Sequence, residues 1–299
     1  MSGMGELHLE ITQYRIVNDY KVPITASTPI VVYRERVRGG GGPFEGKSPN
    51  KHNRFYIEVE PLEDAIMNAI HDGTIPSGQR IKDAKALAKQ LQDLGMEKEE
   101  AKDVVWIKET NMLIDATKGI QYLHETMELV KEAFIEAMTK GPLGQERCMG
   151  MKVRLVDAKL HEDSVHRGPA QVIPAVRSAI YGAMCQAERT LMEPIQKVFL
   201  NLSQDVMGAA IGDIQARRGV IEDIQQEGEV TTIVSKAPVA QMFGFATAIR
   251  GATQGRVLWS TENAGFQPVP AELQRDVVRG IRERKGLSPE PYDEAYYAS

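Results

Sequence analysis

Residues 198–260 carry a clear pattern of secondary structure and read VFLNLSQDVMGAAIGDIQARRGVIEDIQQEGEVTTIVSKAPVAQMFGFATAIRGATQGRVLWS. Alternating and helical periodicities follow one another along this stretch. The expected elements are a strand at 198–201, a helix at 206–216, strands at 220–225 and 230–234, a helix at 239–250 and a strand at 256–260. Two split βαβ units of this length form a ferredoxin-like sandwich, an antiparallel sheet with both helices on one face.

The preceding residues, 39–190, have the pattern of a second α+β unit. Alternation predicts strands at 55–60, 111–115 and 151–160. Helical spacing predicts helices at 62–71, 123–138 and 174–188, of which the second carries an apolar stripe that we expect to cover a sheet. Residues 79–109 are rich in Lys, Ala, Glu and Leu and predict a helical insertion with helices at 84–94 and 97–107. The chain is therefore expected to have a multidomain α+β fold.

The first residues predict only the second half of a domain. Helical spacing at 5–20 and β propensity at 29–33 give one helix and one strand. Residues 38–46 contain five glycines and one proline, which predicts a linker or a long surface loop. The domains expected from these changes are 1–38, 39–190, 191–270 and 271–299. The last contains a helix at 271–285, which we expect to pack on the second domain.

Composition limits the possible functions. The chain has 299 residues, 42% of them hydrophobic, and a formal charge of -5, so RNA binding must be confined to a local patch. Cys148 and Cys185 lie far apart, without zinc-ligand spacing, and indicate reduced thiols in a cytosolic protein. No window approaches the ~18 apolar residues that a membrane span needs, so a cytoplasmic protein without membrane contact is expected.

Two polar loops lie at the ends of neighbouring predicted strands and helices. Their cationic and histidine side chains are Lys47, Lys51, His52 and Arg54 in one loop, and His161, His166 and Arg167 in the other. Binding sites are commonly built from loops at one end of a rigid scaffold. We expect residues 160–168 to form an outer tip beside Lys51 and His52, with His166 exposed.

Residues 41–48 (GGPFEGKS) fit the phosphate-binding pattern G-x-x-x-x-G-K-[ST]. That pattern needs a helix that begins at the Lys-Ser step and faces the phosphate. Pro49 follows at once, and the next expected element is the strand at 55–60. A chance match in a glycine-rich linker is the favoured interpretation, and a phosphate-binding protein that uses 41–48 is kept as an alternative.

His52, His161 and His166 together resemble a catalytic zinc site with one open position. The spacing of five between His161 and His166 suits a loop better than a helix face, and no carboxylate is clearly placed to orient the rings. Glu162 and Asp163 favour a solvated turn, because adjacent side chains diverge rather than face one reacting atom. No metal ligand or catalytic residue is assigned, and a metal-assisted hydrolase that uses the three histidines is kept as an alternative.

Several segments resemble translocation factors of the archaeal and eukaryotic elongation factor 2 family. Residues 2–10 (SGMGELHLE) resemble a helix opening in the third domain of these GTPases, and 241–247 (QMFGFAT) resemble a helix of the fifth. The resemblance to the fourth domain lies in 48–54 (SPNKHNR), 122–124 (YLH), 160–168 (LHEDSVHRG) and 171–174 (QVIP). Residues 168–170 (GPA) replace a run of glycines common in eukaryotic members, which indicates the archaeal branch.

The resemblance implies a truncated ferredoxin-like third domain, a ribosomal-protein-S5-domain-2-like lever domain and a ferredoxin-like fifth domain. It implies that the lever reaches the decoding-centre region of the ribosome during movement of tRNA and mRNA. It also implies that His166 is the histidine converted to diphthamide, recognised by diphthamide-synthesis enzymes and by ADP-ribosylating toxins. RNA contacts are expected from Lys47, Lys51, His52, Arg54, His161 and Arg167.

The resemblance also implies where the cofactors of these proteins bind. GTP and magnesium belong to an N-terminal GTPase domain that is expected to be missing from this chain. The chain itself is therefore expected to have no cofactor and no enzymatic activity, and to be a monomer.

Overall fold

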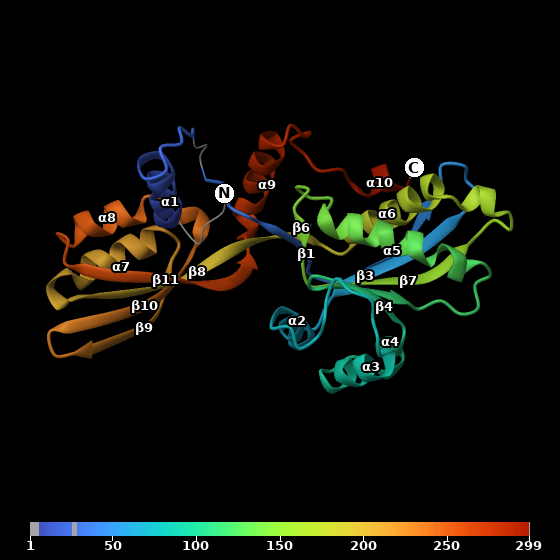
Figure 1. The fold of residues 1–299 in the computed structure, drawn as a ribbon, viewed down its shortest axis with the longest axis horizontal. Helices are drawn as coiled ribbons and strands as arrows, with labels where there is room; N and C mark the ends of the chain where they lie inside the picture. The colour runs from blue at the N-terminus through green and yellow to red at the C-terminus, as the bar shows by residue number, and fades with distance from the viewer. Residues whose placement is uncertain (1–5, 26–28, 299) are drawn as a thin grey trace. The chain divides into compact units, whose positions relative to one another are not determined.

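The computed structural model describes residues 6–25 and 29–298. The chain divides into two compact units. The first contains the residues up to Tyr33 together with Met192–Pro268, and the second contains Arg34–Leu191 together with Val269–Ser299. Figure 1 shows the elements of each unit, coloured from blue at the N-terminus to red at the C-terminus.

The first unit holds the predicted ferredoxin-like module. Its elements are β8 (Arg189–Ser203), α7 (Met207–Ala216), β9 (Val220–Glu227), β10 (Val230–Pro238), α8 (Phe245–Ala252) and β11 (Val257–Pro268). The strands pair antiparallel in the order β11-β8-β10-β9. Both helices lie on one face of this sheet (Figure 1), where Leu200 of β8 shares a buried core with Ile214 of α7 and Ile249 of α8. The βαββαβ prediction is confirmed.

Two details of this module differ from the prediction. β8 and β11 are much longer than expected, because they pair with each other from Val257 opposite Leu202 to Pro268 opposite Met192. The helix expected at 239–250 is broken into a 3-10 turn at Val239–Gln241 and α8, with Gly244 at φ 72 between them. A left-handed residue cannot continue a helix, so α8 begins only after it.

The predicted first helix is present as α1 (Glu6–Asn18), although residues 2–5 of the motif at 2–10 lie outside the described residues. The strand predicted at 29–33 is wrong, since these residues have no regular secondary structure. The chain becomes a strand at β1 (Arg34–Val37), where it pairs in parallel with β6 (Arg147–Cys148). High β propensity alone does not make residues 29–33 a strand, because a strand also needs a partner for its backbone N–H and C=O groups.

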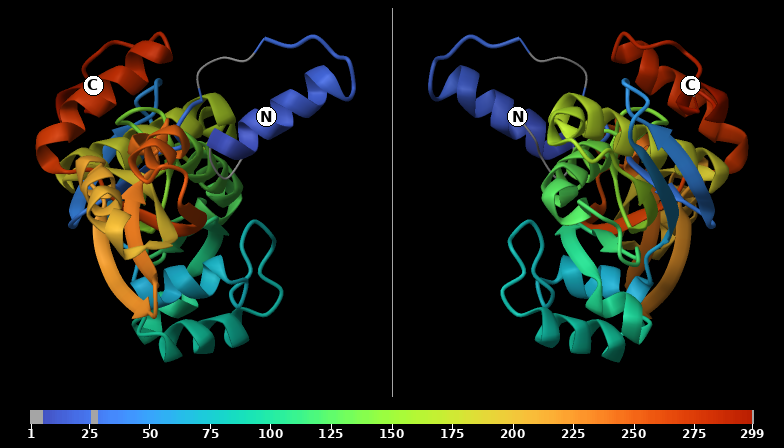
Figure 2. Two further views of the ribbon diagram at one scale, coloured as in Figure 1. Left: turned by 90° about the vertical axis from the view of Figure 1, so that its left-hand side faces the viewer. Right: turned by 90° about the vertical axis from the view of Figure 1, so that its right-hand side faces the viewer.

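The second unit is built on a five-stranded sheet. Its strands follow the order β2 (Gly41–Lys47), β3 (Arg54–Pro61), β7 (Met151–Lys159), β5 (Asn111–Asp115) and β4 (Val104–Lys108). Helices α5 (Leu123–Thr139) and α6 (Pro169–Gln186) cover one face of the sheet. Helices α2 (Asp64–His71), α3 (Ala84–Asp93) and α4 (Lys98–Lys102) lie on the other face, as Figures 1 and 2 show. The strands predicted at 55–60, 111–115 and 151–160 and the helices predicted at 62–71 and 123–138 are confirmed.

The glycine-rich stretch predicted as a linker is the edge strand β2, so that prediction is wrong. Its glycines allow the helix α6 to lie directly on the strand. A Cβ atom at Gly46 would lie 2.0 Å from the Ala175 carbonyl oxygen, and one at Gly41 would lie 2.2 Å from that of Ala183. The glycines therefore serve close packing rather than flexibility.

Two other predicted helices have different bounds. The segment 97–107 is only helical in α4, and it continues as the strand β4, which pairs with β5. The helix predicted to begin at Pro174 begins at Pro169, and Pro174 lies inside it. Pro169 occupies the first turn, where a missing N–H costs nothing, so the first of the two prolines marks the helix start.

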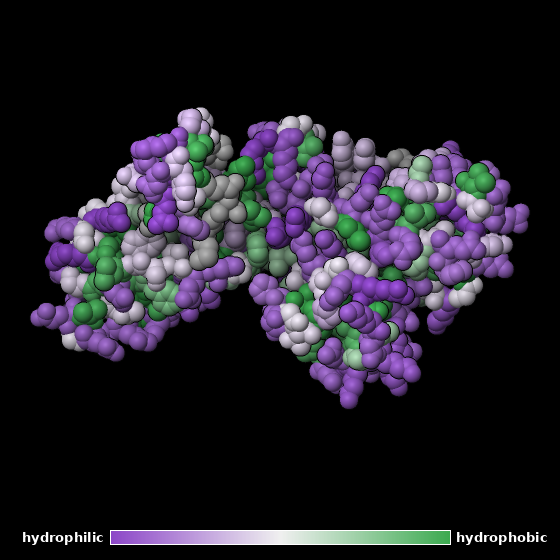
Figure 3. Space-filling model, viewed as in Figure 1, coloured by the Kyte–Doolittle hydropathy of each residue, from purple (hydrophilic) through white to green (hydrophobic). Residues whose placement is uncertain are grey.

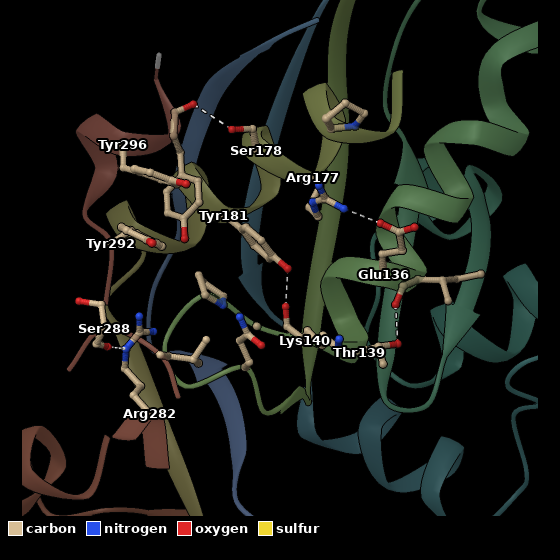
Figure 4. A pocket seen from close by; sticks show the side chains of 17 residues that line it. Glu136, Thr139, Lys140, Arg177, Ser178, Tyr181, Arg282, Ser288, Tyr292 and Tyr296 are labelled. Carbon is tan, nitrogen blue, oxygen red and sulfur yellow. Dashed lines mark hydrogen bonds and ion pairs between the residues drawn. The ribbon is translucent and has the colours of Figure 1, made fainter. Parts of the chain in front are cut away.

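The C-terminal segment belongs to the second unit and contains α9 (Ala271–Arg284) and α10 (Glu294–Tyr297). Arg282 Nη1 donates to the Leu143 carbonyl oxygen at 2.9 Å, and Ser178 Oγ donates to that of Tyr297 at 3.0 Å. Figure 4 shows Tyr181, Tyr292 and Tyr296 around a cavity of about 780 Å³ between this segment, α5 and α6. None of the helices at 6–25 and 29–298 combines the length and the hydropathy that a membrane span requires.

Candidate functional site at the histidine loops

The two polar loops meet at one end of the second unit's sheet. β3 begins at Arg54, directly after the first loop, and β7 ends at Lys159, directly before the second. These two residues lie opposite each other in the antiparallel β3–β7 ladder. The ladder therefore brings together two loops that are far apart in sequence. Figure 3 shows mainly hydrophilic residues over this end of the unit, at the right of the view.

The structure brings the three histidines of these loops together. The ring centroid of His52 lies 5.0 Å from that of His161 and 5.0 Å from that of His166, and the centroids of His161 and His166 are 4.6 Å apart. His52 is exposed, whereas His161 and His166 are half-buried. The prediction that His166 is exposed is therefore corrected to half-buried, because the rings of His52 and His161 lie against it.

A buried amide, Asn53, joins the two loops. Its Nδ2 donates to the His166 carbonyl oxygen at 2.8 Å, and its Oδ1 accepts from the His161 N–H at 3.0 Å. Its own backbone N–H donates to Ser48 Oγ at 2.9 Å, which closes the first loop on itself. One side chain thus fixes the backbone at both histidines of the second loop.

Asn50 adds a second connection to the same carbonyl group. Its Nδ2 donates to the His166 carbonyl oxygen at 3.1 Å, and its backbone N–H donates to Gln171 Oε1 at 2.9 Å. Lys51 follows with φ 63, a left-handed conformation that turns the chain toward His52. The backbone of His166 is therefore fixed, while its imidazole makes no hydrogen bond to any described residue.

Arg167 does not have the exposure expected of an RNA contact. Its side chain is only 4% exposed, and its Nη2 pairs with Glu125 Oε2 at 2.6 Å. Its Nη1 donates to the His161 carbonyl oxygen at 2.9 Å, and its guanidinium lies over the Tyr122 ring at 4.4 Å from the centroid. The sequence-based assignment of Arg167 to RNA is therefore corrected: its charged group is used inside the unit, at the start of α5.

The remaining cations of the site are more accessible. Lys47 and Arg54 both pair with Glu45, at 3.3 and 3.0 Å. Burial raises the pKa of the Glu45 carboxyl, but hydrogen bonds from Tyr56, Lys47 and Arg54 outweigh it and hold that pKa below its usual value. Lys51 is exposed and has no ion pair with a described residue. Lys51 is therefore the cation of the site that is most available to an external anion.

The acidic residues of the second loop shape its turn. Asp163 Oδ1 accepts from the Val165 N–H at 3.0 Å and caps the 3-10 helix Ser164–Arg167. The Asp163 N–H donates to His161 Nδ1 at 3.1 Å, so that nitrogen carries the lone pair. No group of three potential ligands within 6–25 and 29–298 is arranged to hold a metal ion. The alternative of a metal-assisted hydrolase therefore has no support in the geometry.

The phosphate-binding alternative is also unsupported. Residues 41–47 form β2, Ser48 is buried, and the helix that follows in sequence is α2, which begins at Asp64 after β3. None of the site residues lines the cavity of about 780 Å³ near the C-terminal segment. The histidine loops therefore lie outside this cavity, at one end of the sheet.

Sequence reasoning found the histidines but missed the groups that hold them. Asn50 and Asn53 were part of the motif at 48–54 without a role of their own, and Tyr122 and Glu125 were not linked to the loop. Buried and exposed polar residues look alike in a polar segment. Asn53, Phe55 and Ile57 occupy alternate positions, and all three are buried. Side chains at alternate positions of a strand share a face, so this pattern is the signal that could have placed Asn53 on the inner face.

Comparison with known proteins places the chain in a family. Two family models match: "Elongation factor G, domain IV" over residues 73–188 and "Elongation factor G C-terminus" over residues 190–277. Elongation factor 2 of Thermoplasma acidophilum is 64% identical over 299 residues, which are 100% of this chain and 41% of that protein. The chain belongs to the elongation factor 2 family. The resemblance found in the sequence motifs is thereby confirmed.

Other archaeal members of the elongation factor 2 family are also similar over nearly the whole chain. The protein of Methanosphaera stadtmanae is 55% identical over 297 residues, which are 99% of this chain and 40% of the relative. That of Pyrococcus furiosus is 55% identical over 291 residues, which are 97% of this chain and 40% of the relative. The chain thus spans about two fifths of the length of these relatives, and it matches their C-terminal part.

Proposed function

We propose that this chain is the ribosome-binding part of a translation elongation factor 2, which in the full-length protein promotes GTP-dependent translocation of tRNA and mRNA. The observation that carries the proposal is the rigid support of the histidine loop. The His166 carbonyl oxygen accepts hydrogen bonds from Asn53 at 2.8 Å and from Asn50 at 3.1 Å. A loop fixed in this way can hold its position against a moving RNA, whereas a mobile loop would yield.

RNA binding by this site would be local and would depend mainly on shape. Lys51 is the proposed phosphate partner, with Lys47 and Arg54 beside it, and the half-buried rings of His161 and His166 would supply shape. The overall charge of -5 agrees with a small basic patch rather than a basic face. The proposed partners are the ribosomal RNA of the decoding-centre region and the tRNA-mRNA complex.

His166 is the proposed site of diphthamide formation. Its backbone is fixed and its imidazole makes no hydrogen bond to any described residue, so a modifying enzyme would meet an unbonded ring on a fixed backbone. Val165, next to it, is 78% exposed, which indicates that the turn itself is accessible. Diphthamide-synthesis enzymes and ADP-ribosylating toxins are therefore the proposed enzymes that recognise this loop.

The domain scheme that we propose follows the two compact units. Residues up to 33 would belong to a third domain, 34–191 with 269–299 to the lever domain, and 192–268 to the fifth domain. GTP and magnesium would bind in another part of the full-length factor, and this chain would have no catalytic residue of its own. A monomeric, cytoplasmic factor is proposed from the family.

The modification site can be tested with His166→Ala in the full-length factor. The matched control is His71→Ala, which alters an exposed histidine at the end of α2. We expect His166→Ala to abolish toxin-catalysed ADP-ribosylation with an unchanged unfolding midpoint, and His71→Ala to leave both unchanged. Continued labelling of the His166→Ala protein would show that the modification site is elsewhere.

The translocation role can be tested separately with Lys51→Glu. We expect slower single-turnover movement of mRNA on ribosomes, because a carboxylate replaces the exposed cation beside the RNA backbone. GTP hydrolysis by the same factor should be unaffected. Wild-type translocation by Lys51→Glu over a range of salt concentrations would rule out Lys51 as a phosphate partner.

A further inference from the structure

Arg167 is a buried cation that the proposed function leaves without a role. Its side chain is only 4% exposed, although it follows directly after the accessible turn at Val165 and His166. Burying a guanidinium costs several kcal/mol unless the charge is paired and hydrogen-bonded. Its position therefore requires specific partners. The structure provides them for Nη1 and Nη2, whereas Nε is buried without a hydrogen bond to a described residue.

The partners of Arg167 come from two directions. Nη2 pairs with Glu125 Oε2 at 2.6 Å, and the guanidinium plane lies over the ring of Tyr122 at 4.4 Å from its centroid. Nη1 donates to the carbonyl oxygens of His161 at 2.9 Å and of Glu162 at 3.4 Å. The Arg167 side chain therefore connects the two ends of the histidine loop, residues 161–167. It also attaches this loop to the start of α5.

The conformation of Tyr122 is a second, independent observation. Tyr122 precedes α5 with φ 61 and ψ 1, a left-handed conformation that a residue with a bulky side chain rarely adopts. Such a conformation persists where the surroundings compensate for its strain. The stacked guanidinium provides compensation, because it holds the ring over the loop.

His166 is consequently held from two sides. The β2–β3 loop fixes its carbonyl group through Asn50 and Asn53, and α5 fixes the next residue through Glu125 and Tyr122. Removal of either support would leave the other in place, so the imidazole would move without unfolding of the unit.

We propose that Arg167, Tyr122 and Glu125 form a positioning latch, which sets the conformation in which the histidine loop meets the enzyme that modifies it and the RNA. This inference rests on the proposed function of His166. Arg167 is a positioning residue in this arrangement and contacts neither phosphate nor enzyme. Its planar fork is required, because a lysine could form the ion pair but could not also stack on Tyr122 and bond to two carbonyl groups.

The test uses the full-length factor with Arg167→Met, Arg167→Lys or Glu125→Gln. The matched control is Arg177→Met, which removes an ion pair from α6 to Glu136 of α5 at 2.6 Å, away from the loop. We expect kcat/KM for ADP-ribosylation at His166 to fall roughly 10- to 100-fold in Arg167→Met, since small displacements of a reacting group have effects of that size. Arg167→Lys should recover only part of the loss, and Arg177→Met should behave as wild type.

Two further measurements separate a latch from a contact or a general loss of stability. Hydrogen exchange of the amides at 161–167 should become faster in Arg167→Met, while the amides of α5 beyond its first turn keep their protection. The dependence of ribosome affinity on salt should be unchanged in Arg167→Met, but reduced in Lys51→Met, which removes the proposed phosphate contact. If Arg167→Met does not fold, the same measurements are made on Glu125→Gln. This substitution removes the ion pair without a change in side-chain shape.

The outcomes distinguish the latch from the function on which it rests. If the wild-type factor is never modified at His166, the proposed function fails, and the latch is then judged by hydrogen exchange of the loop alone. If Arg167→Met is modified at the wild-type rate with unchanged loop exchange, the latch is overturned. A salt dependence reduced as in Lys51→Met would also overturn it, by showing that Arg167 contacts phosphate.

Discussion

Among single residues, Asn53 connects the two loops directly. It is 0% exposed, and its amide donates to the His166 carbonyl oxygen while accepting from the His161 N–H. The amide carries its donor and its acceptor on two separate atoms, so one side chain can bond to both backbone groups at once. An aspartate would lose the donor. An alanine would leave the His161 N–H without its acceptor and the His166 carbonyl oxygen with only the Asn50 donor.

We therefore expect Asn53→Ala to lower the free energy of unfolding by about 2 kcal/mol, since each buried group left unsatisfied costs on the order of 1–3 kcal/mol and water can reach part of the site. Urea denaturation measures this change. The control is Lys51→Ala, an exposed neighbour, which should change the free energy by less than about 0.5 kcal/mol. Equal effects of the two substitutions would contradict the role given to Asn53.

The site could be predicted only in part from its residues. The convergence of His52, His161 and His166 followed from the ends of two neighbouring strands, which periodicity locates. The burial of Arg167 did not follow, because the composition of a polar loop does not show which charged side chain turns inward. That choice depends on Glu125, whose position relative to the loop is set by the packing of α5 on the sheet.

At the scale of elements, the packing of α6 on β2 explains the glycines of residues 41–46. Composition suggested a flexible linker, because glycine and proline weaken strands on average. The tertiary fold reverses that preference: the helix backbone lies so close that only glycine fits at positions 41 and 46. Sequence periodicity cannot reveal this constraint, since it arises from an element more than 120 positions away in the chain, α6 (Pro169–Gln186).

Gly46→Ala is expected to destabilise the second unit by about 2 kcal/mol or more, because the added methyl group would overlap the Ala175 carbonyl oxygen and overpacking typically costs 1–3 kcal/mol. Gly280→Ala is the control: it lies inside α9, and a Cβ there meets nothing within 4 Å. That substitution should stabilise by about 0.5–1 kcal/mol, as an alanine in a helix interior usually does. Thermal unfolding of both variants measures these changes in stability. An unchanged unfolding temperature in Gly46→Ala would mean that α6 packs less closely on β2.

A network of charges connects the helices of the insertion to the sheet. Lys152 of β7 is 3% exposed, and its Nζ lies 2.7 Å from Glu60, 2.8 Å from Glu63 and 3.0 Å from Glu100. Arg154 on the same strand pairs with Glu60 and Glu100. Burial raises the pKa of the Glu60 carboxyl, but hydrogen bonds from Arg154 and Lys152 outweigh it, so this pKa lies below the usual value of 4.5.

The lowered pKa of Glu60 determines the sign of a pH effect. The stability contributed by this carboxylate is complete above the unfolded-state pKa and is lost as the pH falls through the lower, folded-state pKa. We expect the free energy of unfolding to decrease between about pH 5 and pH 3, and Glu60→Gln to make this decrease smaller. Glu58→Gln on the same strand is the control and should leave the slope unchanged. A Glu60→Gln protein with the wild-type pH profile would exclude Glu60 as a source of the effect.

At the scale of the whole molecule, the sequence predicted the α+β class and the ferredoxin-like module, because periodicity over residues 198–260 locates every element of that module. It placed the first boundary at residue 38, whereas the second unit begins at Arg34. The difference arises at β1, a strand that is recognisable only through its pairing with β6.

Burial is distributed unevenly between α1 and the other helices, which predicts unequal local stability. Ile11, Tyr14 and Val17 of α1 are 46%, 65% and 37% exposed, whereas Val130 and Phe134 of α5 are fully buried. Amides open locally where few apolar contacts hold a helix in place. We therefore expect the amides of 11–17 to exchange with deuterium much faster than those of 130–138 in the isolated chain, as measured by mass spectrometry of peptic peptides. Equal protection of the two segments would show that α1 is held by contacts that its exposed side chains do not reveal.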